Sequence, residues 1–170
     1  MPVIISLSIK SINMKKLFSL VVVFTTLATH QSFAQDNSKT EPAQLLSIYY
    51  DIKDALVSGN TTIASAKAED FVKAMNGADA KTISEASRDA LVKDAGAIST
   101  TKDLKEQRMR FAPFSDNMIT LAKAVKLSAG PVYLQYCPMK KASWLSNQQG
   151  IKNPYYGSAM LTCGSVKATL

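Results

Sequence analysis

The sequence predicts a mainly α protein, an antiparallel four-helix bundle followed by a small irregular or β C-terminal lobe. Two observations support this fold class. Apolar residues recur three or four positions apart in four blocks between residues 42 and 130, which is the period of an amphipathic helix. From residue 131 to 170 this period is lost, and aromatic, β-branched and turn-forming residues take its place. We interpret 131–170 as a lobe of the same domain.

Residues 1–34 have the features of a secretory signal peptide. A pair of lysines precedes the apolar run LFSLVVVFTTLA, and small residues lie at −3 and −1 of a cleavage site between Ala34 and Gln35. The run is shorter than the roughly 20 apolar residues that span a bilayer, so we expect no transmembrane segment in the mature chain. The protein would be periplasmic or secreted. Residues 1–13 are interpreted as a misassigned start, and residues 35–41 as a polar leader.

The composition of the mature chain narrows its chemistry. Cleavage would leave 136 residues, enough for one domain, with 17 Lys and Arg against 13 Asp and Glu. A net charge of +4 gives no reason to expect nucleic acid as a partner. The one histidine, His30, would leave with the signal, which removes the commonest general base and metal ligand. With no glycine-rich phosphate loop and no carboxylate near the cysteines, we do not expect an enzyme.

The first two helical blocks stop at Gly59-Asn60 and at Asn76-Gly77. In each block the apolar positions recur at intervals of four, three and four residues, which places them on one helix face. These positions are Leu45, Tyr49, Ile52 and Leu56 in the first block, and Ala64, Ala68, Phe71 and Met75 in the second. We expect both faces to lie in the core.

The third block opens with Thr82 and Glu85, three residues apart, which predicts a capping box. The fourth block follows Thr101 and is the most regular. Pro113 lies inside it and is expected to kink the helix or to split it in two. The apolar positions of this block are Leu104, Phe111, Phe114, Met118, Leu121 and Val125.

The C-terminal lobe is expected to contain two short strands. One is VYLQY (132–136), which is rich in aromatic and β-branched residues, and the other is AMLTCGSV (159–166). KKASWLS and NPYYG are read as turn-rich connections. Trp144, Tyr155 and Tyr156 are expected to help form the interior of the lobe.

Two cysteines, each with a methionine close by, are the candidate functional residues. Cys137 lies two residues before Met139, and Met160 lies three residues before Cys163. No His, Asp or Glu follows Asp116, so a metal site in the lobe is limited to thiolates, thioethers, amides, hydroxyls and carbonyls. That ligand set is soft and favours Cu(I) or Ag(I).

The same cysteines could instead form a disulfide, because secreted proteins fold in an oxidising compartment. A bridge between Cys137 and Cys163 would close a loop of about 25 residues and contribute roughly 3 kcal/mol to stability. Met139 and Met160 would then be packing residues. A third interpretation is that the thiols stay free or react with a partner. The chemistry of the residues leaves these interpretations open.

The stretch YLQYCPMKKASWLSNQQGIKNPYYGSAMLTCG resembles the signature of a family of secreted bacterial proteins, mostly from the Bacteroidetes. That family is catalogued as a domain of unknown function and is associated with heavy-metal efflux adaptor proteins. The helical block 102–118 resembles it as well. The resemblance implies a periplasmic protein connected with copper or related metals. Cys137, Pro138 and Met139 are also similar to the Cys-Pro-Met-His-Pro motif of efflux adaptors, whose histidine is replaced here by Lys140.

Two functions follow as hypotheses. The first is a non-enzymatic periplasmic protein that binds or relays a soft metal, Cu(I) or Ag(I), in heavy-metal efflux or homeostasis. Its predicted ligands are Cys137, Met139, Met160 and Cys163. The alternative is a disulfide-stapled helical interaction module without metal, whose partner would be an efflux adaptor or another envelope protein. The residues predicted to shield the site or to contact a partner are Tyr133, Tyr136, Trp144, Tyr155 and Tyr156.

Overall fold

The computed structural model describes residues 41–170, so the predicted signal peptide and nearly all of the polar leader lie outside the described residues. The helices are α2 (Pro42–Ser58), α3 (Thr61–Asn76), α4 (Glu85–Ser99) and α5 (Leu104–Ala124). The lobe contains β1 (Tyr133–Cys137), β2 (Ala142–Ser146), the 3-10 helix η1 (Gly157–Met160) and β3 (Ser165–Thr169). The predicted mainly α class with a small β lobe is therefore confirmed.

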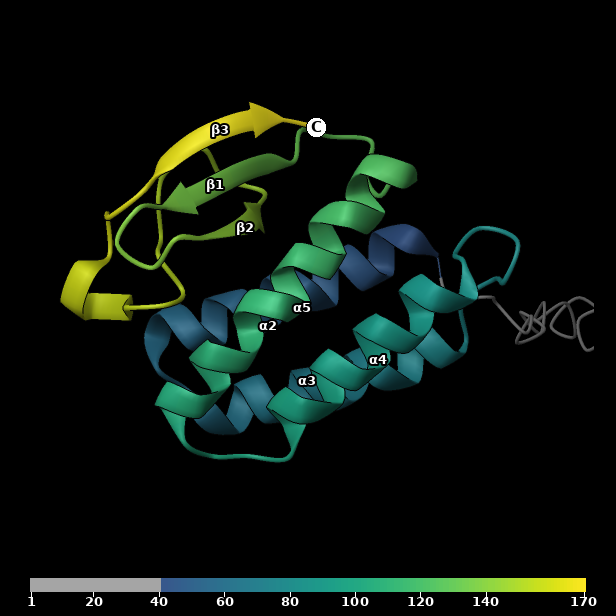
Figure 1. Ribbon diagram of the computed structural model, residues 1–170, viewed down its shortest axis with the longest axis horizontal. Helices are drawn as coiled ribbons and strands as arrows, with labels where there is room; N and C mark the ends of the chain where they lie inside the picture. Colours follow the sequence, from purple (N-terminus) through teal and green to yellow (C-terminus); the bar gives the residue numbers. More distant parts are fainter. Residues whose placement is uncertain (1–40) are drawn as a thin grey trace, which may run out of the picture. The chain divides into compact units, whose positions relative to one another are not determined.

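The helices pack in chain order, α2 on α3, α3 on α4 and α4 on α5 (Figure 1). The apolar positions predicted from the sequence form the core, except Leu104 and Val125, which are half-buried against it. Aromatic rings join the helices at its centre. Phe114 of α5 lies 4.8 Å from the ring of Phe71 in α3 and 5.6 Å from the ring of Tyr49 in α2. Within residues 41–170, no helix is long and apolar enough to cross a membrane.

The start of α4 differs from the predicted capping box. Ser84 is the N-cap, and its hydroxyl accepts a hydrogen bond from the N–H of Ser87. Thr82 lies two residues earlier, where its N–H donates to the carbonyl of Asp79 at 3.0 Å. The prediction was wrong because this local turn already uses the backbone of Thr82.

Pro113 does not split α5, which runs unbroken from Leu104 to Ala124. Proline leaves the carbonyl four residues earlier, that of Met109, without its helical donor. Pro113 and Met109 both lie on the exposed side of the helix. Water can therefore reach the freed carbonyl.

The lobe is a three-stranded antiparallel sheet in the order β2-β1-β3, so β1 is central. The predicted first strand is confirmed with a shift of one residue. The predicted strand over 159–166 was wrong, because most of it forms the end of η1 and a turn, and β3 begins only at Ser165. Strand β2 lies in a stretch that was read as turn-rich.

The sheet meets the helices through the outer edge of β2, the strand nearest α5 in Figure 1. The backbone N–H of Leu145 donates to the hydroxyl of Tyr49 at 3.0 Å, and the hydroxyl of Tyr155 donates to the carbonyl of Ser143 at 2.6 Å. Residues 143 and 145 direct their polar groups to the same side of the strand, away from β1. Two tyrosine hydroxyls thus hydrogen-bond backbone groups at the edge of β2 that have no partner strand.

Candidate thiol site

The two cysteines are brought together at one end of the sheet. Cys137 is the last residue of β1, and Cys163 lies in the turn between η1 and β3. Their sulfur atoms are 3.5 Å apart, which places the two thiols within hydrogen-bonding distance. Both thiols are free, with Cys137 completely buried and Cys163 half-buried.

Strand pairing explains this placement. Tyr136 pairs with Ser165 across β1 and β3, so the residues just beyond that pair must meet. Gly164 fills the narrow space beside them with φ at 153°. A Cβ at this position would lie 2.9 Å from Cη2 of Trp144 and 3.0 Å from the carbonyl oxygen of Tyr136. The glycine therefore lets the indole ring pack against the backbone that follows Cys163.

The surroundings of Cys137 favour its thiolate. Burial of the thiol acts to raise its pKa. Hydrogen bonds from the backbone N–H of Lys140, from the Cys163 thiol and from the Asn153 amide outweigh that effect. The N–H of Met139 adds a further donor, and the pKa of Cys137 is lowered below its ordinary value.

Cys163 responds in the opposite direction. Its hydrogen bond to Cys137 stabilises the protonated form, and burial adds to the effect, so the pKa of Cys163 is raised. The pair shares a proton, because the first ionisation on Cys137 makes the second one harder. A cationic ligand that offsets the added negative charge would favour full deprotonation of both sulfurs.

Asn153 is a site residue that was not predicted. It is completely buried, and its side-chain Nδ2 donates to the carbonyl of Cys163 at 2.8 Å while its Oδ1 accepts from the N–H of Tyr155 at 2.9 Å. The second bond forms an Asx turn, for which the Asn-Pro pair at 153–154 was the sequence signal. Asn153 fixes the turn that carries Cys163.

The two methionines are not equivalent in position. The backbone N–H of Met139 hydrogen-bonds both sulfurs, yet its side chain is 65% exposed. Met160 is half-buried in η1, and its carbonyl accepts from the N–H of Cys163 at 3.1 Å. Each methionine is thus attached to the site by its backbone.

The predicted aromatic residues surround the lobe in different ways. Trp144 and Tyr155 are buried and pack edge to face with ring centres 6.0 Å apart, so they form the interior, as expected. Tyr136 is half-buried beneath the ammonium group of Lys167, at 5.5 Å from the ring centre. Tyr133 and Tyr156 are half-buried. The latter three leave part of each ring open to contact.

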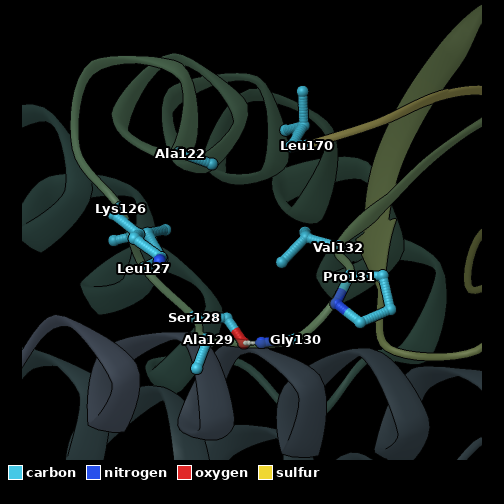
Figure 2. Close-up of a pocket in the computed structure, with 9 residues that line it drawn as sticks. All are labelled: Ala122, Lys126, Leu127, Ser128, Ala129, Gly130, Pro131, Val132 and Leu170. Atoms are coloured by element: carbon cyan, nitrogen blue, oxygen red, sulfur yellow. Dashed lines mark hydrogen bonds between the residues drawn. The ribbon is translucent and has the colours of Figure 1, made fainter.

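The remaining donor groups do not extend the site. Among residues 41–170, no group of three or more His, Cys, Asp or Glu is arranged to hold a metal ion. The side chains that line a cavity of about 430 Å³ at the loop between α5 and β1 include no sulfur or carboxylate, and Lys126 is the only charged one among them (Figure 2). The thiol pair is therefore the candidate site.

These features define a mainly α protein whose small β lobe presents two adjacent thiols. The chain belongs to the family described as a protein of unknown function (DUF3347), whose model matches residues 45–130. That match covers the four helices and ends before β1, so the thiol pair lies outside it. Comparison with curated proteins and with solved structures finds no significant match. The expectation of a family of unknown function is confirmed, while the link to heavy-metal efflux stays a prediction.

Proposed function

We propose that the protein binds one soft monovalent metal ion, Cu(I) or Ag(I), through the thiolates of Cys137 and Cys163. The observation that carries the proposal is the 3.5 Å separation of the two sulfurs at a place where hydrogen-bond donors stabilise negative charge. Two thiolates form a soft ligand set, and soft ligands select Cu(I) among biological metals.

The donor set argues against harder metals at this site. Structural zinc needs four ligands, usually cysteine or histidine, and the described residues offer only the two thiols. Calcium and magnesium need six or more oxygen ligands, which are supplied mainly by carboxylates. A monovalent soft ion accepts fewer ligands, so the available pair is sufficient.

Charge supports the same conclusion. Binding of Cu(I) releases the two thiol protons, and the resulting unit of one Cu(I) ion and two thiolates carries a net charge of −1. The backbone N–H groups of Met139 and Lys140 and the amide of Asn153 face the sulfur of Cys137 and stabilise that charge. Because the sulfurs of Cys137 and Cys163 otherwise share a proton, the metal takes the place of that proton.

The methionines would have separate roles. The exposed thioether of Met139 meets solvent next to the pair, where it would receive an incoming ion before the thiolates do. Met160 is closer to the lobe interior and would complete the ligand set after binding. The resemblance to proteins associated with heavy-metal efflux adaptors supports an activity in the envelope, and an adaptor is the proposed partner.

Competition with a chromogenic Cu(I) chelator under reducing, anaerobic conditions tests the proposal. Cys137→Ser and Cys163→Ser should each lower Cu(I) affinity by about 100-fold or more, because each removes one of two strong ligands. Met139→Leu should weaken binding less. Met109→Leu is the matched control, since Met109 is 58% exposed on α5 and should change nothing. Unchanged affinity in both serine variants would refute the site.

The alternative function, a disulfide-stapled interaction module, is favoured by the same sulfur contact. Thiol–disulfide exchange with an oxidised donor would remove one hydrogen from each thiol and join the end of β1 to the turn before β3. Intact mass with thiol alkylation separates the two functions. A mass about two units below the reduced value, with no alkylation and no metal, would favour the staple.

A further inference from the structure

A second cavity, of about 560 Å³, lies where the start of α5 meets the lobe. Its polar walls come from three places in the chain that are far apart in sequence. These are Asp103, Lys105 and Arg108 near the start of α5, Lys140 in the turn after β1, and Tyr155 and Tyr156 before η1. The volume is in the range of small-molecule sites in proteins.

The cavity is positively charged. Three of its lining residues are cations, Lys105, Arg108 and Lys140, and one is an anion, Asp103. The Asp103 carboxylate is already used as the N-cap of α5, where it accepts from the N–H of Glu106 at 2.7 Å. Within residues 41–170, neither lysine makes an ion pair. The first turn of α5, whose dipole also favours anions, lies at the same place.

Arg108 is held in one position in the wall of the cavity. Its Nη2 donates to the carbonyl of Leu56 at 2.8 Å, while its Nε is buried with no hydrogen-bond partner in the described part of the chain. The guanidinium packs against Gly157, where a Cβ would lie 2.3 Å from Nη2. Burial lowers the pKa of Arg108, which means that the charged group loses more solvation than it regains.

We propose that this cavity binds a small organic anion that bears carboxylate or phosphate groups. An anion would pair with Lys105 and Lys140 and offset the partial desolvation of Arg108, while its apolar part would contact the ring of Tyr156. Two acidic groups match the lining charge of three cations and one anion. The proposal is independent of metal binding, although Lys140 joins the two sites because its N–H contacts the Cys137 sulfur.

The test uses protein expressed from the full coding sequence, reduced and metal-free, and titrated separately with citrate and with inorganic phosphate. Amide chemical shifts should change saturably at the start of α5, around Lys140 and around Tyr156. The probe that saturates at the lower concentration identifies the acidic group. Absence of saturable shifts in this cavity at about 10 mM of either probe would overturn the proposal, since the dissociation constant would then lie well above about 10 mM.

Charge removal provides the matched comparison. Lys105→Gln combined with Lys140→Gln should weaken binding by about fivefold or more, because two of the three cations are lost. Lys102→Gln combined with Lys141→Gln removes the same two charges from exposed residues that do not line the cavity, and should leave the affinity unchanged. Equal weakening by this control pair would show general charge attraction and would overturn the proposal. All variants expose their substitutions, so unchanged melting temperatures check the fold.

Discussion

Tyr49 and Tyr50 are neighbours in α2, and removal of their hydroxyl groups should have opposite effects on stability. The hydroxyl of Tyr49 hydrogen-bonds the hydroxyl of Ser115 and accepts from the N–H of Leu145. The hydroxyl of Tyr50 is buried without a partner in the described residues. Tyr49→Phe should therefore destabilise the fold, and Tyr50→Phe should leave it equally stable or more stable.

The size of the Tyr49 effect follows from burial. Tyr49, Ser115 and Leu145 are all completely buried, so water cannot replace the lost bonds. Loss of the hydrogen bonds costs about 1 kcal/mol, and an orphaned buried N–H at Leu145 costs about 1–3 kcal/mol more. We expect a total of about 2–4 kcal/mol, a large part of the roughly 5–15 kcal/mol that stabilises a domain.

The aromatic packing of the ring should be unchanged, since phenylalanine keeps the stacked contact with Phe111 at 5.4 Å and the contact with Phe114. Chemical denaturation of both variants and the wild type measures the free energies of unfolding. Hydrogen exchange gives a second reading, because the amide of Leu145 should exchange faster in Tyr49→Phe alone. The melting temperature should fall by about 4 °C for each kcal/mol lost.

Two results would refute this reasoning. If Tyr49→Phe loses less than about 1 kcal/mol, the hydroxyl does not hold the edge of β2. If both variants lose stability equally, the effect comes from ring packing and not from hydrogen bonding. Selective loss in Tyr49→Phe would establish that this hydroxyl couples α2, α5 and the sheet.

Three further predictions concern pH, a turn and a cap. Burial raises the pKa of Tyr50 from 10.0 to about 12, so the folded state keeps a proton that the unfolded state releases. The free energy of unfolding should therefore fall as pH rises from about 10 to 12. Thermal melts at alkaline pH should show a smaller fall for Tyr50→Phe than for the wild type. Gly157→Ala should lower the free energy of unfolding by about 3 kcal/mol, because a Cβ at φ 56° would meet the Val57 carbonyl oxygen at 2.7 Å. Gly59→Ala should lower it by about 1 kcal/mol in the same denaturation assay, because at φ 75° the nearest atom is 3.5 Å away. Ser84→Ala should lower the free energy of unfolding by about 1 kcal/mol, and Thr82→Ala should lower it less. A larger loss in Thr82→Ala would instead support the capping box predicted from the sequence.

The helices could be predicted from the sequence because their signals are local. Apolar residues at 4, 3, 4 spacing, together with Gly59 after the first block, define α2 without reference to the rest of the chain. Its C-cap is indeed Gly59 in the left-handed region, with a cap N–H that reaches the carbonyls of Ala55 and Leu56. The glycine that predicts the end of the helix and the apolar spacing that predicts its length therefore agree on where α2 ends.

The sheet was predicted only in part because strand pairing is not local. ASWLS in β2 has no clear alternation of apolar and polar residues, since Trp144, Leu145 and Ser146 are all buried. It is a strand because it pairs with β1 on one side and meets tyrosine hydroxyls on the other. No window of sequence contains both of those partners.

The thiol site and the basic cavity also depend on contacts that are not local in sequence. Both hypotheses for the two cysteines required Cys137 and Cys163 to lie close together, as they do. Asn153 and the backbone donors of 139–140 could not be predicted, because they depend on how two turns meet. The basic cavity is less predictable still, because its cations come from α5 and from the turn after β1. Charge at a site can be read from sequence only when the charges are neighbours in the chain.

The position of each sulfur in the sheet determines how a ligand would enter. Cys137 is fixed at the end of the central strand, which has a partner strand on both sides, and its side chain is completely buried. Cys163 lies in a turn, is half-buried and is oriented by Asn153. Under the proposed function, a metal ion or an oxidised thiol would therefore reach Cys163 before Cys137. The sulfur with the lower pKa would be the second one reached, so Cys137 would retain the ligand and Cys163 would exchange it.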